Sequence, residues 1–148
     1  MLFVGHLTLG VLAFLLAQPY LVGNQVLLFL TVLLGSLLPD IDEENSRICK
    51  WSGPIGKLVA KTFPHRGFIH SLLFFAILYL LINYYVNIYY ATALIIGYFA
   101  HITGDGISVS GLRIFFPLKF KIRGPLRVGS AFEHVIVACL LVWIVYLL

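Results

Sequence analysis

The residues of this chain best suited to chemistry are histidines and aspartates in four short stretches of the sequence. Imidazole nitrogen and carboxylate oxygen form the ligand set of zinc, and also of manganese or iron, in hydrolytic sites. Such a site needs no thiolate, and a set larger than four ligands is sufficient for one or two ions. The seven candidate metal ligands are His6, Asp40, Asp42, His65, His70, His101 and Asp105.

The spacing of these residues suggests how they are presented. His101 and Asp105 form an i,i+4 pair, so both project from one face if the segment is helical. Asp40 and Asp42 are two residues apart, and an extended chain there would aim both carboxylates in one direction. The two histidines that bound residues 65–70 lead into an apolar run, which predicts one ligand from a loop and one from a helix.

Taken singly, several polar residues have an ordinary structural explanation. Asp42 is a residue type that caps a following turn, and Arg66 is one more basic residue in a loop. Glu133 stands where a helix dipole favours a carboxylate, and His134 suits a membrane-interface anchor. The glutamates at positions 43–44 fit a solvated loop. The convergence of the seven candidates favours a metal site over these separate explanations.

The composition excludes an ordinary soluble domain. The chain is 61% hydrophobic and 11% charged, whereas soluble domains have about 45–50% apolar and about 25% charged residues. We therefore predict a polytopic membrane protein. The two cysteines, Cys49 and Cys139, form no CxxC pair, which argues against a disulfide framework and against cysteine-based metal or redox chemistry.

Five apolar stretches approach the length that spans a bilayer, for which helices are the suitable element. The first lacks the basic region of a signal peptide, so we expect it to remain as a membrane helix. We predict an all-α protein with one domain, residues 1–148, about five transmembrane helices and a short helix near residues 55–61. The apolar stretches are residues 2–17, 22–38, 68–86, 88–102 and 131–148.

The charges predict the orientation. All ten lysines and arginines lie in two loops, residues 40–67 and 105–130. With five spans, both loops share a side with the N-terminus, and the positive-inside rule makes that side cytoplasmic. All seven candidate ligands then lie at cytoplasmic helix ends. The second loop interleaves aromatic and basic residues, which suits either the headgroup layer or a solvated loop. Topology explains the basic residues, so no nucleic acid partner is expected.

Three motifs and the N-terminal histidine resemble the YdjM family of inner-membrane-associated, metal-dependent hydrolases. The family shows LPDxD, HRGxTHS and HxxxD motifs, which this chain matches in order and spacing over nearly its whole length, with Ile69 where threonine is usual. The resemblance implies a multi-pass enzyme of the inner membrane that holds a divalent metal. The matching segments are Leu38-Pro39-Asp40-Ile41-Asp42, His65-Arg66-Gly67-Phe68-Ile69-His70-Ser71 and His101-Ile102-Thr103-Gly104-Asp105.

The order of the ligands is also similar, more weakly, to the zinc-dependent phospholipase C class of helical enzymes. We therefore expect hydrolysis of a phosphoester in a membrane lipid or another amphiphile, through water activated by one or two divalent ions, zinc first and manganese or iron next. Asp42 or Glu133 would act as the general base, and Arg66 would hold a phosphate oxygen. His65 would be a metal ligand or would orient one.

Two other functions fit the same cluster. Acids and histidines in membrane proteins often mark ion pathways, so a metal-ion or proton transporter is one alternative. A structural metal that ties helix ends together is the other.

Overall fold

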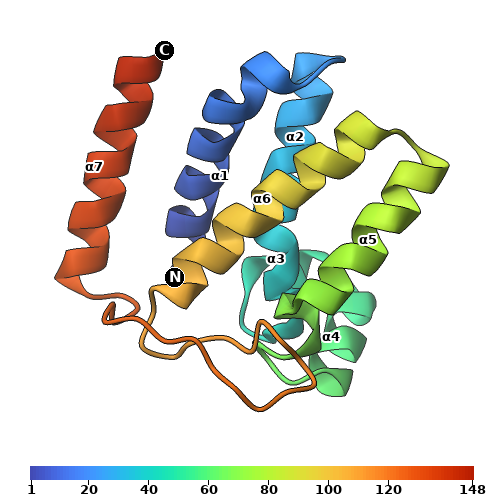
Figure 1. Cartoon of the computed structure of the whole chain (residues 1–148). Coiled ribbons are helices and arrows are strands. Elements are labelled where there is room, and N and C mark those ends of the chain that lie inside the picture. The colour runs from blue at the N-terminus through green and yellow to red at the C-terminus, as the bar shows by residue number, and fades with distance from the viewer.

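The computed structural model covers the whole chain, residues 1–148, and its regular elements are all helices, which confirms the predicted all-α class. Seven α-helices are joined by loops and three short 3₁₀ segments (Figure 1). The α-helices are α1 (Phe3–Ala17), α2 (Gln25–Leu37), α3 (Arg47–Trp51), α4 (Gly53–Thr62), α5 (Leu72–Tyr85), α6 (Ile88–Gly106) and α7 (Ala131–Leu147). The 3₁₀ segments are η1 (Gln18–Tyr20), η2 (Leu38–Asp42) and η3 (Phe68–His70).

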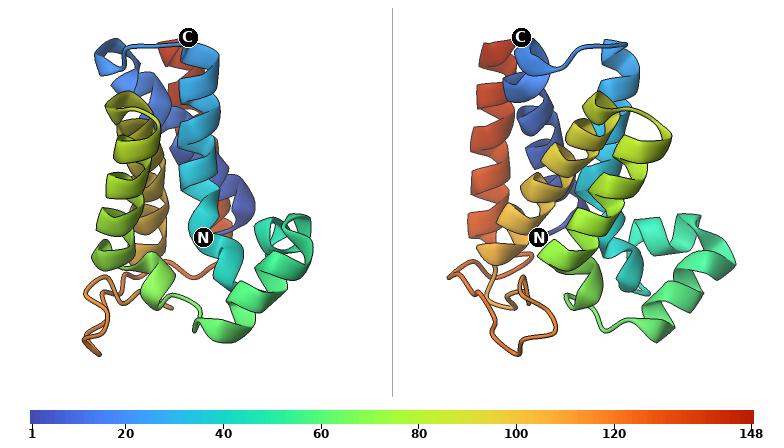
Figure 2. Two further views of the ribbon diagram at one scale, coloured as in Figure 1. Left: turned by 90° about the vertical axis from the view of Figure 1, so that its right-hand side faces the viewer. Right: turned by 45° about the vertical axis from the view of Figure 1, so that its right-hand side comes forward.

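The five apolar stretches correspond to the five long helices α1, α2, α5, α6 and α7. These helices make up the body of the molecule, and the two termini lie at opposite ends of it (Figures 1 and 2). Helices α3 and α4 project sideways near the end that holds the N-terminus. Two segments, Phe3–Tyr20 and Gln25–Asp42, have the length and hydropathy needed to cross a bilayer, and the apolar helices α5 and α7 are shorter.

The most extensive helix contact joins α2 and α6, and it depends on two glycines. A Cβ atom at Gly35 would collide with the backbone carbonyl of Leu94, and one at Gly97 would collide with the carbonyl of Val32. The two backbones therefore touch directly, as small residues allow in membrane helix pairs. This contact places the C-terminal end of α6 against the segment that follows α2.

Replacing Gly97 with alanine should separate α2 from α6 and lower the free energy of unfolding by about 1–3 kcal/mol or more, since backbone atoms cannot move aside as a side chain can. The measurement is thermal or denaturant unfolding in detergent micelles. Gly106→Ala on the same helix is the matched control, because a Cβ there meets its nearest neighbour at 3.6 Å, an ordinary contact. Equal stability of the two variants would contradict the role of the glycine contact.

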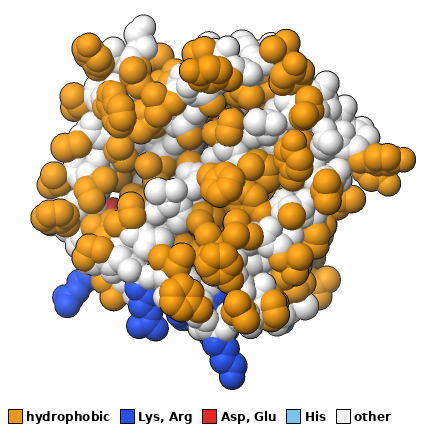
Figure 3. All heavy atoms as spheres, viewed as in Figure 1, with side chains coloured by type: hydrophobic (Ala, Val, Ile, Leu, Met, Phe, Trp, Pro, Cys, Tyr) orange, Lys and Arg blue, Asp and Glu red, His pale blue; other side chains and the backbone are white.

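The surface of the helical body is apolar, as expected for a chain of this composition. Figure 3 shows hydrophobic side chains over most of the visible face, with lysine and arginine gathered at the lower end. Helix α7 is an extreme case because it buries only Glu133 and Ile144, while Val142 and Val145 are 71% and 73% exposed. A helix that is apolar on its exposed faces suits lipid better than water.

One local prediction about the ligand segments is wrong. Residues 40–42 are not extended: Pro39 lies at the start of η2, and its fixed φ continues the helical turn from α2. Residues two apart on a 3₁₀ helix project in different directions, so Asp40 and Asp42 face different partners. His65 lies in a turn and His70 in the 3₁₀ helix η3, which agrees with one ligand from a loop and one from a helix, and α5 itself begins at Leu72.

Candidate metal centre

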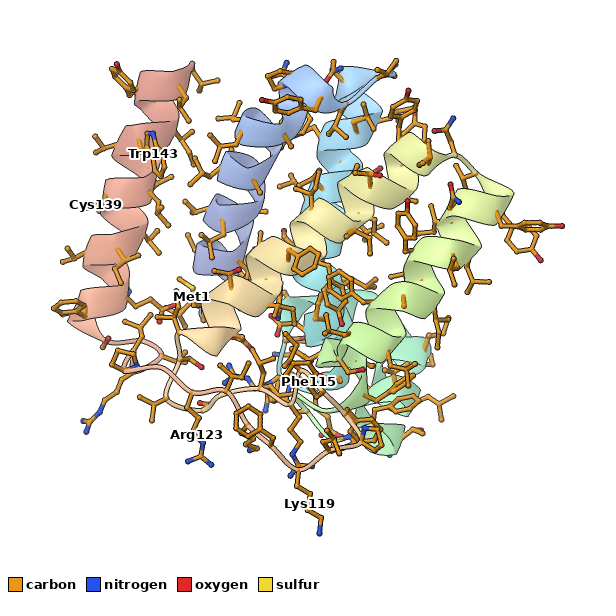
Figure 4. The ribbon with its side chains drawn as sticks, in the orientation of Figure 1. Met1, Phe115, Lys119, Arg123, Cys139 and Trp143 are labelled. Carbon is orange, nitrogen blue, oxygen red and sulfur yellow. The ribbon has the colours of Figure 1, made fainter.

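The seven predicted ligands come together at the end of the bundle that holds the N-terminus, where α1, η2, η3 and α6 meet. Most are fully buried, but 17% of the Asp40 side chain and 33% of the His65 side chain remain exposed. Figure 4 shows Met1 at this end, whereas the side chains of Lys119 and Arg123 point away from the bundle. The buried members are His6, Asp42, His70, His101 and Asp105.

Three groups of three side chains each place their ligand atoms within 4.8 Å of one another. His70 and His101 each belong to two groups, so the three groups form one continuous cluster. The groups are His6, Asp40 and His101; His70, His101 and Asp105; and Asp42, His65 and His70.

The fold positions the two central histidines through hydrogen bonds to their surroundings. The Tyr98 hydroxyl donates to the backbone carbonyl of Ile69, which ties η3 to α6 directly before His70. His101 lies one turn further along α6, and its Nδ1 is 2.8 Å from the carbonyl oxygen of Ser36. A carbonyl only accepts, so the proton of this imidazole is on Nδ1.

The same reasoning applies to His70, whose Nδ1 is 3.1 Å from a carboxylate oxygen of Asp42. Both rings therefore carry a proton on Nδ1, and in the neutral form of each ring the Nε2 lone pair is free. These Nε2 atoms of His70 and His101 are 3.2 Å apart. Two nitrogens bound to one tetrahedral zinc lie about 3.3 Å apart, so the pair fits a shared metal ion and is repulsive without a cation.

Asp105 supplies a carboxylate to the same place. Its Oδ2 is 3.8 Å from Nε2 of His70 and 3.9 Å from Nε2 of His101. Its Oδ1 accepts from the Met1 ammonium at 2.5 Å, and this positive charge favours the ionised carboxylate, which is the form that binds a metal.

Arg66 has a different partner from the phosphate predicted for it. Its Nη2 donates to Oδ1 of Asp105 at 2.9 Å, and its Nε lies 2.8 Å from Oδ2. The third nitrogen, Nη1, donates to the Ser108 hydroxyl at 2.9 Å. Arg66 adopts a left-handed backbone conformation, φ 59°, that turns its side chain toward α6. The guanidinium thus neutralises and orients Asp105.

His6 is buried with neither ring nitrogen in a hydrogen bond. Its ring stacks on that of His101, with centroids 3.8 Å apart, and its Nε2 lies 3.4 Å from Oδ1 of Asp105. A buried imidazole without a partner is costly, and a metal ligated by one of its nitrogens would remove that cost. Asp40 lies nearby, 3.7 Å from Nε2 of His101. This group is the second place where the residues fit an ion.

Asp42 and His65 are bound to each other rather than directed at the centre. One oxygen of Asp42 lies 2.6 Å from Nδ1 of His65, and the other accepts from His70 and from the backbone N–H of Arg66. Burial disfavours the charged imidazolium of His65, but Asp42 and Glu43 outweigh it and raise its pKa. Asp42 thus orients His70, as a carboxylate behind a metal-binding histidine does.

Glu133, the other predicted general base, accepts backbone hydrogen bonds with both carboxylate oxygens. Oε1 accepts from the N–H of Leu2 at 2.6 Å, and Oε2 accepts from the N–H of Gly129 at 2.7 Å. The side chain is buried and holds the start of α7 against the start of the chain. These contacts favour a structural role for Glu133 at the start of a helix over a role as general base. His134 is exposed and bonds only the Ser130 carbonyl of its own helix.

The sequence reasoning missed two charged residues near the centre. The sequence predicts a solvated loop position for Glu43, and the structure adds that its Oε2 lies 3.6 Å from Nε2 of His65. The positive-inside rule alone accounts for Arg47 in the sequence. Both line a cavity of about 600 Å³ that also reaches Asp40 and Arg66. The available signal was proximity in sequence, because both residues follow the Asp40 segment directly.

Comparison with known proteins places this site in a family. The model of the YdjM inner membrane protein family matches residues 1–148. The chain belongs to the YdjM family. This membership confirms the predicted family, and the family's description agrees with the membrane protein expected from composition. No solved structure matches the chain.

Three relatives match most of this chain. A Bacillus subtilis protein, "Uncharacterized protein YvsG", is 32% identical over 138 residues, which are 90% of this chain and 85% of the relative. The "Inner membrane protein YdjM" of Escherichia coli and that of Shigella flexneri are each 34% identical over 131 residues. Those residues are 79% of this chain, but they span only 64% of the length of each of these two relatives.

Proposed function

We propose that this YdjM-family chain is a metal-dependent hydrolase of the inner membrane that cleaves a phosphoester in a lipid or another amphiphile. The observation that carries the proposal is the 3.2 Å approach of the Nε2 atoms of His70 and His101, with the Asp105 carboxylate beside them. Three such ligands leave a zinc ion with an open position, which is the arrangement of catalytic zinc sites.

His70, His101 and Asp105 would hold the first ion, and His6 and Asp40 would supply ligands to a second, because the single free Nε2 of His101 can bind only one ion. A divalent metal bound there supplies an activated water at neutral pH and polarises the scissile group. Manganese and iron accept the same nitrogen and oxygen ligands.

The chain's own residues would perform the remaining tasks around this centre. Asp42 keeps His70 in the tautomer that exposes Nε2, and Arg66 keeps Asp105 ionised and in place. Glu43, the carboxylate of this region with 37% of its side chain exposed, is our candidate for the general base. It replaces Asp42 and Glu133, whose oxygens are already engaged.

The proposed topology has five spans, formed by α1, α2, α5, α6 and α7, with the N-terminus and both long loops in the cytoplasm. The termini at opposite ends of the molecule support an odd number of crossings (Figure 1). Helix α4 supports the position of the interface, because exposed Ile55 and Leu58 share one stripe beside Lys57 and Lys61. Such a helix suits the headgroup layer of an anionic membrane.

Protein purified without chelator should carry about one to two zinc equivalents, measured by inductively coupled plasma mass spectrometry. Chelation should lower the melting temperature by about 5 °C or more, because a ligand that binds only the folded state stabilises it. Restoring zinc should restore stability. A native preparation that holds no transition metal and does not respond to chelator would rule out the centre.

Hydrolysis is tested with lipid phosphoesters in mixed micelles, by the release of phosphate or of a phosphorylated headgroup with and without added zinc. Zinc-dependent turnover supports the hydrolase. Zinc-dependent stability without turnover on any phosphoester would instead favour a structural metal that ties α1, η2, η3 and α6 together. Flux of metal or protons into liposomes would favour the transporter.

A further inference from the structure

The cavity beside the metal cluster has two chemically different sides. It measures about 600 Å³, and Asp40, His65 and Arg66 form the wall next to the cluster. The apolar part of the lining comes from the start of α1, from α3 and from the loop before α7. The apolar residues used below are Leu2, Phe3, Val4, Ile48 and Val128.

Arg47 is the basic residue of this cavity whose charge is not already neutralised. The guanidinium of Arg66 is paired with Asp105, and the imidazole of His65 is bound to Asp42. Arg47 has no carboxylate within 4.0 Å, and its guanidinium lies 4.6 Å from the centre of the Phe3 ring. A cation held over an aromatic ring is positioned and still has all of its donors free.

The apolar wall opens toward the outer surface of α1. Leu2 and Val4 line the cavity and are also 40% and 50% exposed. An acyl or alkyl chain that leaves the cavity along these residues would stay on the apolar face of the first helix. The cavity therefore combines a fixed cation, a metal-binding candidate and an apolar exit.

We propose that this cavity is the binding site for an amphiphile with one phosphate-like anionic head, with Arg47 holding the head and the α1 wall holding the chain. Arg47 thereby takes the phosphate-binding role expected of Arg66. The inference rests on the proposed hydrolysis at the cluster, since it names the substrate class of that site. Arg47 is suited to the role because a guanidinium binds phosphate oxygens through two parallel hydrogen bonds.

Binding can be followed through Trp51, whose ring lies 5.9 Å from that of Phe3 at the cavity wall. In a Trp143→Phe background, Trp51 is the single tryptophan. The probe is a brominated long-chain alkyl phosphonate, which quenches tryptophan and contains no ester bond to hydrolyse. The two matched halves of the probe are the brominated alcohol of the same chain and methylphosphonate used as a competitor.

The alkyl phosphonate should bind the purified protein at least about tenfold more tightly than either half, because a charge-assisted contact and the apolar wall both contribute. Arg47→Gln should weaken the binding of the alkyl phosphonate by about tenfold and leave the affinity for the alcohol unchanged. Lys50→Gln, an exposed charge on the same helix that lies outside the cavity, should stay within about twofold of the parent.

Three results would overturn the inference: equal affinity of the Arg47→Gln variant and its parent, equal binding of the alcohol, or methylphosphonate binding as tight as the full probe. The last result would indicate a site for a free phosphate-like anion. The proposed function fails separately. Binding that depends on Arg47, in a protein with no metal and no turnover, would leave this site standing and remove the hydrolase.

Discussion

Replacing His101 with alanine should abolish metal binding and activity together. His101 belongs to two of the three ligand groups, and its Nε2 faces that of His70 at 3.2 Å. The loss in metal affinity should exceed about 100-fold, the upper range for residues that only orient a ligand. Competition with a chromogenic chelator measures the affinity, and phosphate release from lipid micelles measures the activity.

A graded series separates ligands from the residues that position them. Asp42→Asn should cost about 10–100-fold in metal affinity, because it removes the carboxylate that holds Nδ1 of His70 but no proposed ligand. His134→Ala, the histidine outside the cluster, should keep the affinity and activity of the parent. The assignment of the centre would be wrong if His101→Ala retained full metal content. It would also be wrong if His134→Ala lost metal affinity and activity as His101→Ala is expected to do.

Replacing Arg66 with alanine should lower the free energy of unfolding of the metal-free protein by about 1–3 kcal/mol. The reason is Asp105, which is fully buried and receives two of its close charged contacts from Arg66. The Met1 ammonium would remain beside Asp105, but the carboxylate would lose two charge-assisted contacts that water cannot replace in the buried site. Denaturant unfolding in micelles measures the change.

Arg123→Ala is the matched control for Arg66→Ala, because it deletes the same side chain from an exposed loop position and should change stability by less than about 0.5 kcal/mol. The double variant Arg66→Ala with Asp105→Ala should recover part of the loss, which identifies the pair as its source. Equal destabilisation by the Arg66 and Arg123 variants would show that Asp105 does not depend on Arg66.

Much of the fold was predictable because the strongest signals are local. The observed helices α1, α2 and α7 begin or end within three residues of the predicted apolar stretches, and α4 covers the short helix expected near residues 55–61. Helix α6 continues one turn past the apolar run, to Gly106, because His101 and Asp105 face a polar centre and not lipid. Hydrophobicity alone ends that helix too early.

The roles within the site were less predictable, since they depend on contacts between distant segments. No local sequence signal identifies Asp105, which is 39 residues away, as the partner of Arg66. Glu133 is 131 residues from Leu2, whose backbone N–H it accepts. The conformation of the Asp40 segment followed from Pro39 continuing a helical turn, where an extended chain was expected.

The sequence by itself determined the helical class, the family and the set of polar residues that gather at one end of the molecule, because composition, spacing and motif order are local properties. The tertiary structure alone decided which of these residues face the proposed metal position and which bind one another. It turned His70, His101 and Asp105 toward one point and bound Asp42 to His65. It also left Arg47 unpaired at the cavity. The physical reason is that each polar side chain has few donors and acceptors, and packing decides which partner takes them.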